Sequence, residues 1–301
     1  MSFEVILPFL GPIRQLLEDR TISEIMVNPD SAIWIEENGE IRLLPELRFD
    51  DGALLTSLEV IANRFGKKLD GDSPIMNLRL PDGSRLAALI PPIVHPSPLL
   101  TIRKFTSRGF TMNDLITRDV LTPEQANTLA RSVAQGDNLL ISGGTGSGKT
   151  TLLNVLATFI PDRERILVLE DTAELHISKS HVISAEAQLD THRNPIQFGD
   201  LLRAALRHRP DRIILGEIRG TEARVFLDAL NTGHRGSLST IHANSAEDAL
   251  LRLSQLALRS SAGITLGEVE KECRRSIGLI VHIAKVNGMR KVQQVINIGI
   301  K

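Results

Sequence analysis

The sequence predicts an α/β protein in which a parallel sheet flanked by helices forms the larger, C-terminal part and a smaller α+β unit precedes it. The C-terminal two thirds alternate short, nearly continuous apolar runs with helical patterns, as expected of parallel strands buried on both faces. The first third instead carries short segments joined by hairpin signals. A length of 301 residues fits two domains at the usual ~150 residues each.

The N-terminal unit is predicted from its turns and one helical pattern. Residues 32–36 and 40–44 alternate apolar and polar side chains around Asn38-Gly39, a dipeptide typical of tight hairpin turns. Apolar residues at helical spacing predict a helix over 50–65 that ends at Gly66. The other expected strands cover residues 78–80, 85–90 and 100–105, the first two forming a second hairpin.

A change of pattern marks the domain boundary. Residues 106–120 are mostly polar, and strands and helices begin to alternate after them. We therefore expect an N-terminal α+β domain over 1–107, a linker over 108–120 and the parallel-sheet domain over 121–301.

The parallel-sheet domain is predicted to open with a helix at Thr122, because Pro123 and Gln125 suit the first and third helical positions after an N-cap threonine. The expected strands are 138–142, 166–170, 212–216 and 237–242, and the expected helices begin at 122 and 149 and cover 200–208, 222–230 and 246–258. Residues 279–283 and 292–298 are expected to close the domain as an antiparallel hairpin around Asn287-Gly288.

Composition excludes several classes of function. With 35 basic and 36 acidic side chains the net charge is −1, which argues against a dedicated nucleic-acid binder. Aromatic residues make up only 3% of the chain, so a stacking platform for single strands is not expected. The single cysteine, Cys273, excludes an internal disulfide framework and a cysteine-based zinc site.

The sequence predicts no membrane span and no secretory signal. It has no uninterrupted apolar run of about 18 residues, the length that a spanning helix needs. Its apolar start lacks a basic n-region and a small-residue cleavage site. We therefore expect a cytoplasmic protein.

The strongest chemical signal is GGTGSGKT, which matches the phosphate-binding pattern G-x-x-x-x-G-K-[ST]. Glycines let backbone N–H groups point inward as an anion nest, the lysine reaches the β- and γ-phosphates, and the final hydroxyl ligates Mg²⁺. The positive end of the following helix also favours phosphate. The motif comprises Gly143, Gly144, Thr145, Gly146, Ser147, Gly148, Lys149 and Thr150, with Thr151 next in the helix.

Polar residues follow the other predicted parallel strands. Glu170-Asp171, Glu217 and His242 each come where an apolar run stops, and ligands of open parallel sheets bind beyond the carboxyl ends of the strands. We interpret residues 212–217 as the Walker B strand, although Gly216 occupies the position where an Asp usually ligates Mg²⁺. The carboxylate of Glu217 must then serve the water shell of the metal, the attacking water, or both.

Several segments together resemble the secretion ATPase superfamily, the traffic ATPases of type II and type IV secretion, conjugation and type IV pili. The resemblance runs from about residue 21 to 298 and is greatest to the branch that holds tight-adherence pilus ATPases and conjugative-transfer ATPases. Besides the phosphate-binding motif, it is carried by LPDGSRLAALIPP, LTIRKF, LEDTAEL, LRHRPDRIILGEIRG and LNTGHRGSLSTIHANS.

The resemblance implies roles for individual residues. Glu217 matches the glutamate that polarises the attacking water, and His242 matches a histidine that senses the γ-phosphate. Acidic residues that help to organise metal and water match Glu170, Asp171 and Glu174, and arginines that face or cover the nucleotide match Arg209, Arg85 and Arg103. Thr150 and Glu217 are the implied residues at the metal.

The resemblance also implies a fold and an activity. It implies a RecA-like P-loop ATPase domain with an N-terminal domain that covers the nucleotide, and an ATP- and Mg²⁺-dependent motor for pilus assembly, type II or type IV secretion, or conjugation. The motor is expected to be a hexameric ring that acts on an inner-membrane platform protein, peripheral to that membrane and without nucleic acid. Two alternatives remain at this point: a nucleic-acid translocase on a RecA-like core, and a nucleotide-gated scaffold.

Overall fold

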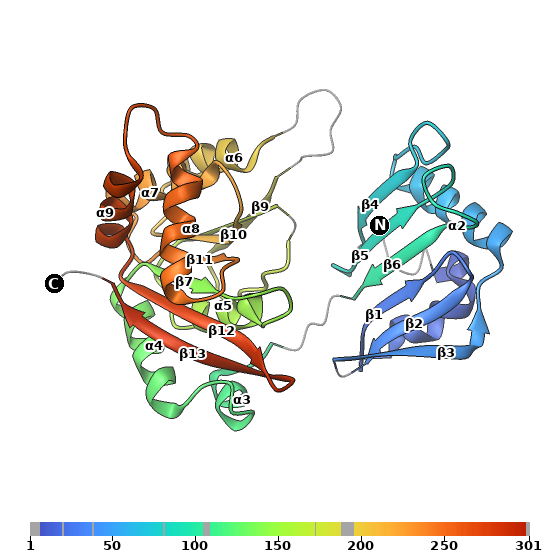
Figure 1. Cartoon of the computed structure of the whole chain (residues 1–301), viewed down its shortest axis with the longest axis horizontal. Helices are drawn as coiled ribbons and strands as arrows, with labels where there is room; N and C mark the ends of the chain where they lie inside the picture. The colour runs from blue at the N-terminus through green and yellow to red at the C-terminus, as the bar shows by residue number, and fades with distance from the viewer. Residues whose placement is uncertain are drawn as a thin grey trace. The chain divides into compact units, whose positions relative to one another are not determined.

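The computed structural model describes residues 7–19, 21–37, 39–80, 82–104, 109–171, 173–187 and 196–298 (Figure 1). The chain divides into two compact units, residues 1–107 and residues 108–301. Each unit has its own hydrophobic core.

The N-terminal unit is built on an antiparallel sheet in the order β3-β2-β1-β6-β5-β4. Its strands are β1 (Ile22–Val27), β2 (Ala32–Glu37), β3 (Glu40–Arg48), β4 (Ile75–Arg79), β5 (Arg85–Leu89) and β6 (Leu99–Arg103). Both predicted hairpins are present, as β2–β3 and β4–β5. The predicted turn residues Asn38 and Pro81, and Phe105 at the end of the third predicted strand, lie outside the described residues.

Helices α1 (Arg14–Glu18) and α2 (Asp51–Arg64) complete this unit. The side chain of Asp50 caps α2 by accepting the N–H of Ala53 at 2.9 Å, and the helix stops before Gly66, as predicted. Leu58 and Ile61 of α2 are fully buried against the sheet.

The C-terminal unit contains a mainly parallel sheet in the order β13-β12-β7-β11-β10-β8-β9, in which only β13 runs antiparallel to its neighbour. Its strands are β7 (Leu139–Ser142), β8 (Ile166–Glu170), β9 (Val182–Glu186), β10 (Arg212–Ile218), β11 (Leu238–Ile241), β12 (Leu279–Val286) and β13 (Met289–Asn297). The predicted strands are therefore confirmed, and β7, β8 and β11 are buried throughout.

Helices cover both faces of this sheet. One hydrophobic cluster joins the sheet to α4 (Pro123–Gln135) and α5 (Lys149–Ala157). A second cluster lies under α6 (Phe198–Ala205), α7 (Glu222–Asn231), α8 (Ala246–Leu258) and α9 (Leu266–Ser276), with the 3₁₀ turn η4 (Leu206–His208) after α6. This layering brings the carboxyl ends of the parallel strands to one edge of the sheet.

The predicted linker over 108–120 is wrong, because this segment belongs to the C-terminal unit. It contains helix α3 (Met112–Thr117), which begins with a capping box between Thr111 and Asp114. Leu115 and Val120 are buried in the same cluster as α4 and α5. Among the described residues, polar Thr111 and Asp114 form the cap of this short helix and Asn113 is exposed on it.

Besides α3, helices α1 and α9 and strand β9 were not predicted from the sequence, and no membrane helix is found among the described residues. Strand β9 is only partly buried at the sheet edge, and α9 has a polar exposed face. In the part of the chain that the structure describes, no helix is long and apolar enough to cross a bilayer.

Candidate active site

The predicted phosphate-binding loop connects the end of β7 to the start of α5. Glycine at 143 is required by a close approach, because a Cβ there would lie 2.2 Å from the carbonyl oxygen of Ile283 on β12. Gly146 has a φ of 68°, in the left-handed region that favours glycine. These glycines allow the turn that leads directly into the N-terminus of α5.

Lys149 is folded back over this loop. Its ammonium donates hydrogen bonds to the carbonyl oxygens of Gly143 at 2.8 Å and Gly144 at 2.9 Å, and the residue is only 8% exposed. Burial lowers the pKa of Lys149, and the nearby Glu217 carboxylate opposes this effect. The loop thus holds a buried cation whose partners are neutral carbonyl groups that an anion can replace.

The loop also contains a buried polar atom without a partner. Among the described residues, Ser147 Oγ is buried and makes no hydrogen bond. Within the described residues, the backbone N–H of Ser147 makes only a long bond of 3.4 Å, to the carbonyl of Gly144. A phosphate oxygen would satisfy both groups, so the loop fits the triphosphate that its sequence predicts.

The carboxylate at the end of β8 organises the segment that follows it. Glu170 is 2% exposed, and its Oε1 accepts the backbone N–H groups of Glu174 at 2.7 Å and Leu175 at 2.9 Å. A Cβ at residue 216 would lie 3.0 Å from Glu170 Cγ. Gly216 therefore leaves the room that Glu170 occupies, which explains why no Asp stands at this Walker B position.

Glu174 is brought to the phosphate-binding loop by this arrangement. Its Oε2 lies 3.2 Å from the hydroxyl of Thr150, the predicted Mg²⁺ ligand. The structure thus joins the loop to the acidic segment across 24 residues of sequence. Oxygen donors of this kind suit a magnesium ion that also keeps water and phosphate ligands.

Arg219 links two of the predicted acidic residues. Its guanidinium pairs with Asp171 and also with Glu217, whose Oε2 is 2.9 Å away. Buried Glu222 fixes the backbone by accepting the N–H groups of Arg219 and Gly220. Arg219 was not among the predicted site residues, although its position directly after β10 and two residues after Glu217 was a usable signal.

His242 and Arg209 lie at opposite ends of their strands. His242 directly follows β11, at the same sheet edge as the loop, and is exposed. Arg209 precedes β10, whose carboxyl end carries Glu217, so about 20 Å of strand separates the two residues. The family resemblance implied that Arg209 faces the nucleotide. Within one chain, however, the structure places Arg209 away from the loop.

The other two predicted arginines belong to the N-terminal unit. Arg85 on β5 and Arg103 on β6 are directly opposite each other in the register. Arg79 on β4 is opposite Arg85, and Glu24 on β1 is opposite Arg103. Directly opposed residues share one face of a sheet, so the unit presents a row of three arginines that ends at an acidic residue. Arg79 was missed because its position depends on strand register.

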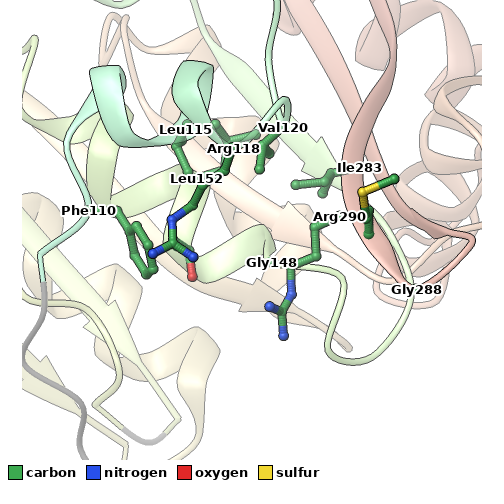
Figure 2. A pocket seen from close by; sticks show the side chains of 11 residues that line it. Phe110, Leu115, Arg118, Val120, Gly148, Leu152, Ile283, Gly288 and Arg290 are labelled. Carbon is green, nitrogen blue, oxygen red and sulfur yellow. The ribbon is translucent and has the colours of Figure 1, made fainter. Parts of the chain in front are cut away.

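A cavity of about 220 Å³ lies beside the phosphate-binding loop (Figure 2). Its lining includes Gly148 and Thr151 at the start of α5, and apolar side chains such as Leu115 and Met289. The guanidinium of Arg118 lies over the ring of Phe110 at 5.2 Å. A partly apolar cavity next to an anion site suits a flat base attached to phosphates.

The acidic groups do not by themselves form a metal cage. Within the described ranges, no set of three or more His, Cys, Asp or Glu residues is arranged to hold a metal ion. A magnesium ion that accompanies a nucleotide needs only one or two protein ligands besides the phosphates. The hydroxyl of Thr150 and the carboxylate of Glu217 remain the candidate ligands.

Comparison with known proteins identifies the family. The family model described as type II/IV secretion system protein matches residues 9–286. The chain belongs to this family. It is 37% identical over 287 residues to the conjugal transfer protein TrbB of Rhizobium radiobacter, covering 94% of this chain and 85% of that protein. It is 31% identical to the type IV secretion system protein VirB11 of Bartonella quintana, covering 97% and 92%.

Solved structures agree with this assignment. The VirB11 ATPase of the Brucella suis type IV secretion system, crystallised with sulphate, matches with a TM-score of 0.53 and 27% identity over 97% of each chain. The pilus retraction motor PilT with bound ADP matches with a TM-score of 0.67 over 98% of this chain and 82% of that chain, and at 19% identity it supports the fold alone. The RecA-like ATPase fold and the secretion ATPase superfamily predicted from the sequence are confirmed: the protein is a secretion-system ATPase.

Proposed function

We propose that this ATPase hydrolyses MgATP at residues 143–151 to drive a type IV secretion or conjugation apparatus. The observation that carries the proposal is the convergence of Lys149, Thr150, Glu174 and Glu217 at one sheet edge. The relatives named above, from conjugal transfer and type IV secretion, support this system rather than the tight-adherence pilus that the sequence resemblance also included.

The loop and its lysine bind the triphosphate in this proposal. Lys149 exchanges the carbonyl groups of Gly143 and Gly144 for β- and γ-phosphate oxygens, and the exchange is favourable because a charged acceptor forms a stronger hydrogen bond than a neutral one. Ser147 supplies the N–H and the unpartnered hydroxyl described above. The base enters the cavity beside Phe110, whose lining is partly apolar.

The carboxylates prepare the reaction. Bound Mg²⁺ supplies neutralisation of the charge that develops on the transferred phosphoryl group. Thr150 is positioned to hold that ion, and Glu174 orients the Thr150 hydroxyl. Glu217 leaves its ion pair with Arg219 and accepts a hydrogen bond from the attacking water, while His242 at the adjacent strand end contacts the γ-phosphate side.

The remaining predictions concern the assembly. We infer that the ATPase works as a hexameric ring on an inner-membrane platform protein, from the cytoplasmic side. Arg85 and Arg103 would bring positive charge to the nucleotide from the N-terminal unit, so that hydrolysis depends on the position of that unit. Membership of the family and likeness to type IV secretion proteins support this inference.

Substitution of Lys149 tests the proposal. Lys149→Ala should weaken MgATP binding and reduce phosphate release by the purified full chain by about 100-fold or more, since it removes the main cation of the loop. Lys68→Ala is the matched control, because Lys68 forms a surface ion pair with Asp70. Wild-type binding and turnover in Lys149→Ala would refute the assignment of the phosphate site.

A further inference from the structure

The C-terminal hairpin, formed by β12 and β13, contacts the phosphate-binding loop. We propose that Arg290, on β13, is a positioning residue that holds this loop in the shape that accepts phosphate. The proposal rests on the function proposed above and adds a residue that no motif of the sequence indicates. Arg290 lies 144 residues from its partner in the loop.

The contact is a direct hydrogen bond. Arg290 Nε donates to the carbonyl oxygen of Gly146 at 3.0 Å. The stem of the side chain passes close to Gly148, where an added Cβ would lie 3.1 Å from Arg290 Cδ. Figure 2 shows the side chain extending from the hairpin alongside Gly148, at the rim of the cavity.

This bond fixes the orientation of one peptide group. The carbonyl of Gly146 and the N–H of Ser147 belong to the same planar trans peptide, so they point in opposite directions. While Arg290 holds the carbonyl, the N–H stays on the other side of that peptide. This is the N–H whose only described bond is the long one to Gly144, at 3.4 Å.

The hairpin is anchored well enough to impose this orientation. Strand β12 pairs in parallel with β7, which leads into the loop, and His282 is in register with Ser142. Their side chains meet in the core, with Ser142 Oγ 3.0 Å from His282 Nδ1. On the other strand, the N–H of Val292 donates to the carbonyl of Val120 at 2.8 Å.

Without the hydrogen bond from Arg290, the backbone of the phosphate-binding loop would rotate more freely. Gly146 has no Cβ and a φ of 68°, so its backbone resists rotation less than that of other residues. Removing the guanidinium would let the peptide rotate and would require nucleotide binding to restore its orientation. Loss of Arg290 is therefore expected to weaken nucleotide binding and not to slow the chemical step, because Arg290 contacts the loop and is not assigned to the reacting phosphate.

The test compares Arg290→Ala, Arg290→Lys and Lys291→Ala in the full chain. Lys291 is the matched control, because it is the next cationic residue and pairs with Asp119 at the surface. MgATP affinity is measured by calorimetry, and kcat and KM by phosphate release. Arg290→Ala should raise Kd and KM about tenfold, or about 1.4 kcal/mol, with kcat within about twofold of wild type.

Recovery of MgATP affinity in Arg290→Lys would distinguish a positioning role of Arg290 from general damage to the structure. The Lys variant carries an N–H donor on a similar stem, so it should recover most of the affinity that Arg290→Ala loses. Lys291→Ala should bind MgATP as the wild type does. Melting temperatures without nucleotide should agree within about 2 °C among all variants, because the substitutions are at the surface.

The outcomes distinguish this inference from the proposed function. Wild-type affinity in Arg290→Ala would overturn it, and so would a loss of kcat at unchanged KM or a Lys variant no better than the Ala variant. In each of these cases the proposed function would still be supported if the wild-type protein binds MgATP and the Lys149→Ala variant does not. Failure of the wild type itself to bind MgATP would instead refute the proposed function.

Discussion

Glu170 is the residue that arranges the acidic side of the site, although it does not itself reach the loop. Its buried carboxylate accepts two backbone N–H groups and thereby orients the segment that carries Glu174. Gly216 on the neighbouring strand leaves space for it. A carboxylate at a strand end therefore has a structural role here, beside the chemical one that the sequence resemblance implied.

The first residue-scale prediction concerns this carboxylate. Glu170→Leu should lower the free energy of unfolding by about 2–4 kcal/mol, because it leaves two buried N–H groups without an acceptor. Glu170→Gln retains an acceptor oxygen and should lose less. Urea unfolding of the three proteins measures the difference, and equal stability of Glu170→Leu and wild type would contradict the structural role.

A second prediction concerns the single cysteine. Burial raises the pKa of the Cys273 thiol to about 11. At pH 8 the folded protein then holds only about 0.1% thiolate, against about a quarter for an exposed thiol, so alkylation should be slow until the protein unfolds. Mass spectrometry after iodoacetamide treatment, with and without denaturant, checks this. Rapid labelling of the folded protein would show that Cys273 is accessible.

Among individual residues, the phosphate-binding motif could be predicted from the sequence, but the partners of several side chains could not. The loop from Gly143 to Thr150 could be predicted because its function depends on a local pattern of glycines and one lysine. The pair between Arg219 and Glu217 depends on how the exposed Arg219 side chain turns towards a half-buried carboxylate at a strand end. The contact of Arg290 with Gly146 depends on a strand pairing across 144 residues, which no local pattern contains.

At the scale of elements, the central parallel strands were predicted well because their apolar runs are buried on both faces. Helix α3 was missed because it shows only one turn and a half of helix and a mostly polar sequence. Its one buried residue, Leu115, and Val120 after the helix are too few for a periodic pattern. Strand β9 was missed for a similar reason, since its residues are at most partly buried.

The assignment of α3 to the C-terminal unit is testable. Leu115→Ala should destabilise the protein by about 2–4 kcal/mol, because Leu115 is 4% exposed in the cluster beneath α4 and α5. Asn113→Ala, at an exposed position of the same helix, should change stability by less than about 0.5 kcal/mol. Denaturant unfolding that finds equal stabilities for the two variants would favour a linker at this position.

At the scale of the whole molecule, the two units contribute different charges. The C-terminal unit holds the loop and the acidic groups, and the N-terminal unit presents Arg79, Arg85 and Arg103 in one row. The sequence predicted both units because each has its own pattern of strands and turns. How the units are arranged around a nucleotide does not follow from those patterns, because each pattern describes one unit alone.

The arginine row gives a prediction at this scale. Arg103→Ala should slow ATP hydrolysis by about tenfold or more and leave the melting temperature of the protein nearly unchanged, because an arginine that covers phosphates acts on the transition state. Arg42→Ala is the control. Arg42 lies on β3, the edge strand farthest from β4 in the same sheet, and pairs with Glu37 at the surface. An unchanged rate in Arg103→Ala would remove the main support for coupling between the units.

The most direct test of the central claim, that Glu217 acts on a nucleotide held by the Lys149 loop, is to measure binding and turnover in one variant. Glu217→Gln should bind MgATP with an affinity close to that of wild type and hydrolyse it about 100-fold or more slowly, because the amide cannot accept the proton of the attacking water. Glu270→Gln, which alters a surface pair with Arg274, should behave as wild type. Wild-type turnover by Glu217→Gln would contradict the account.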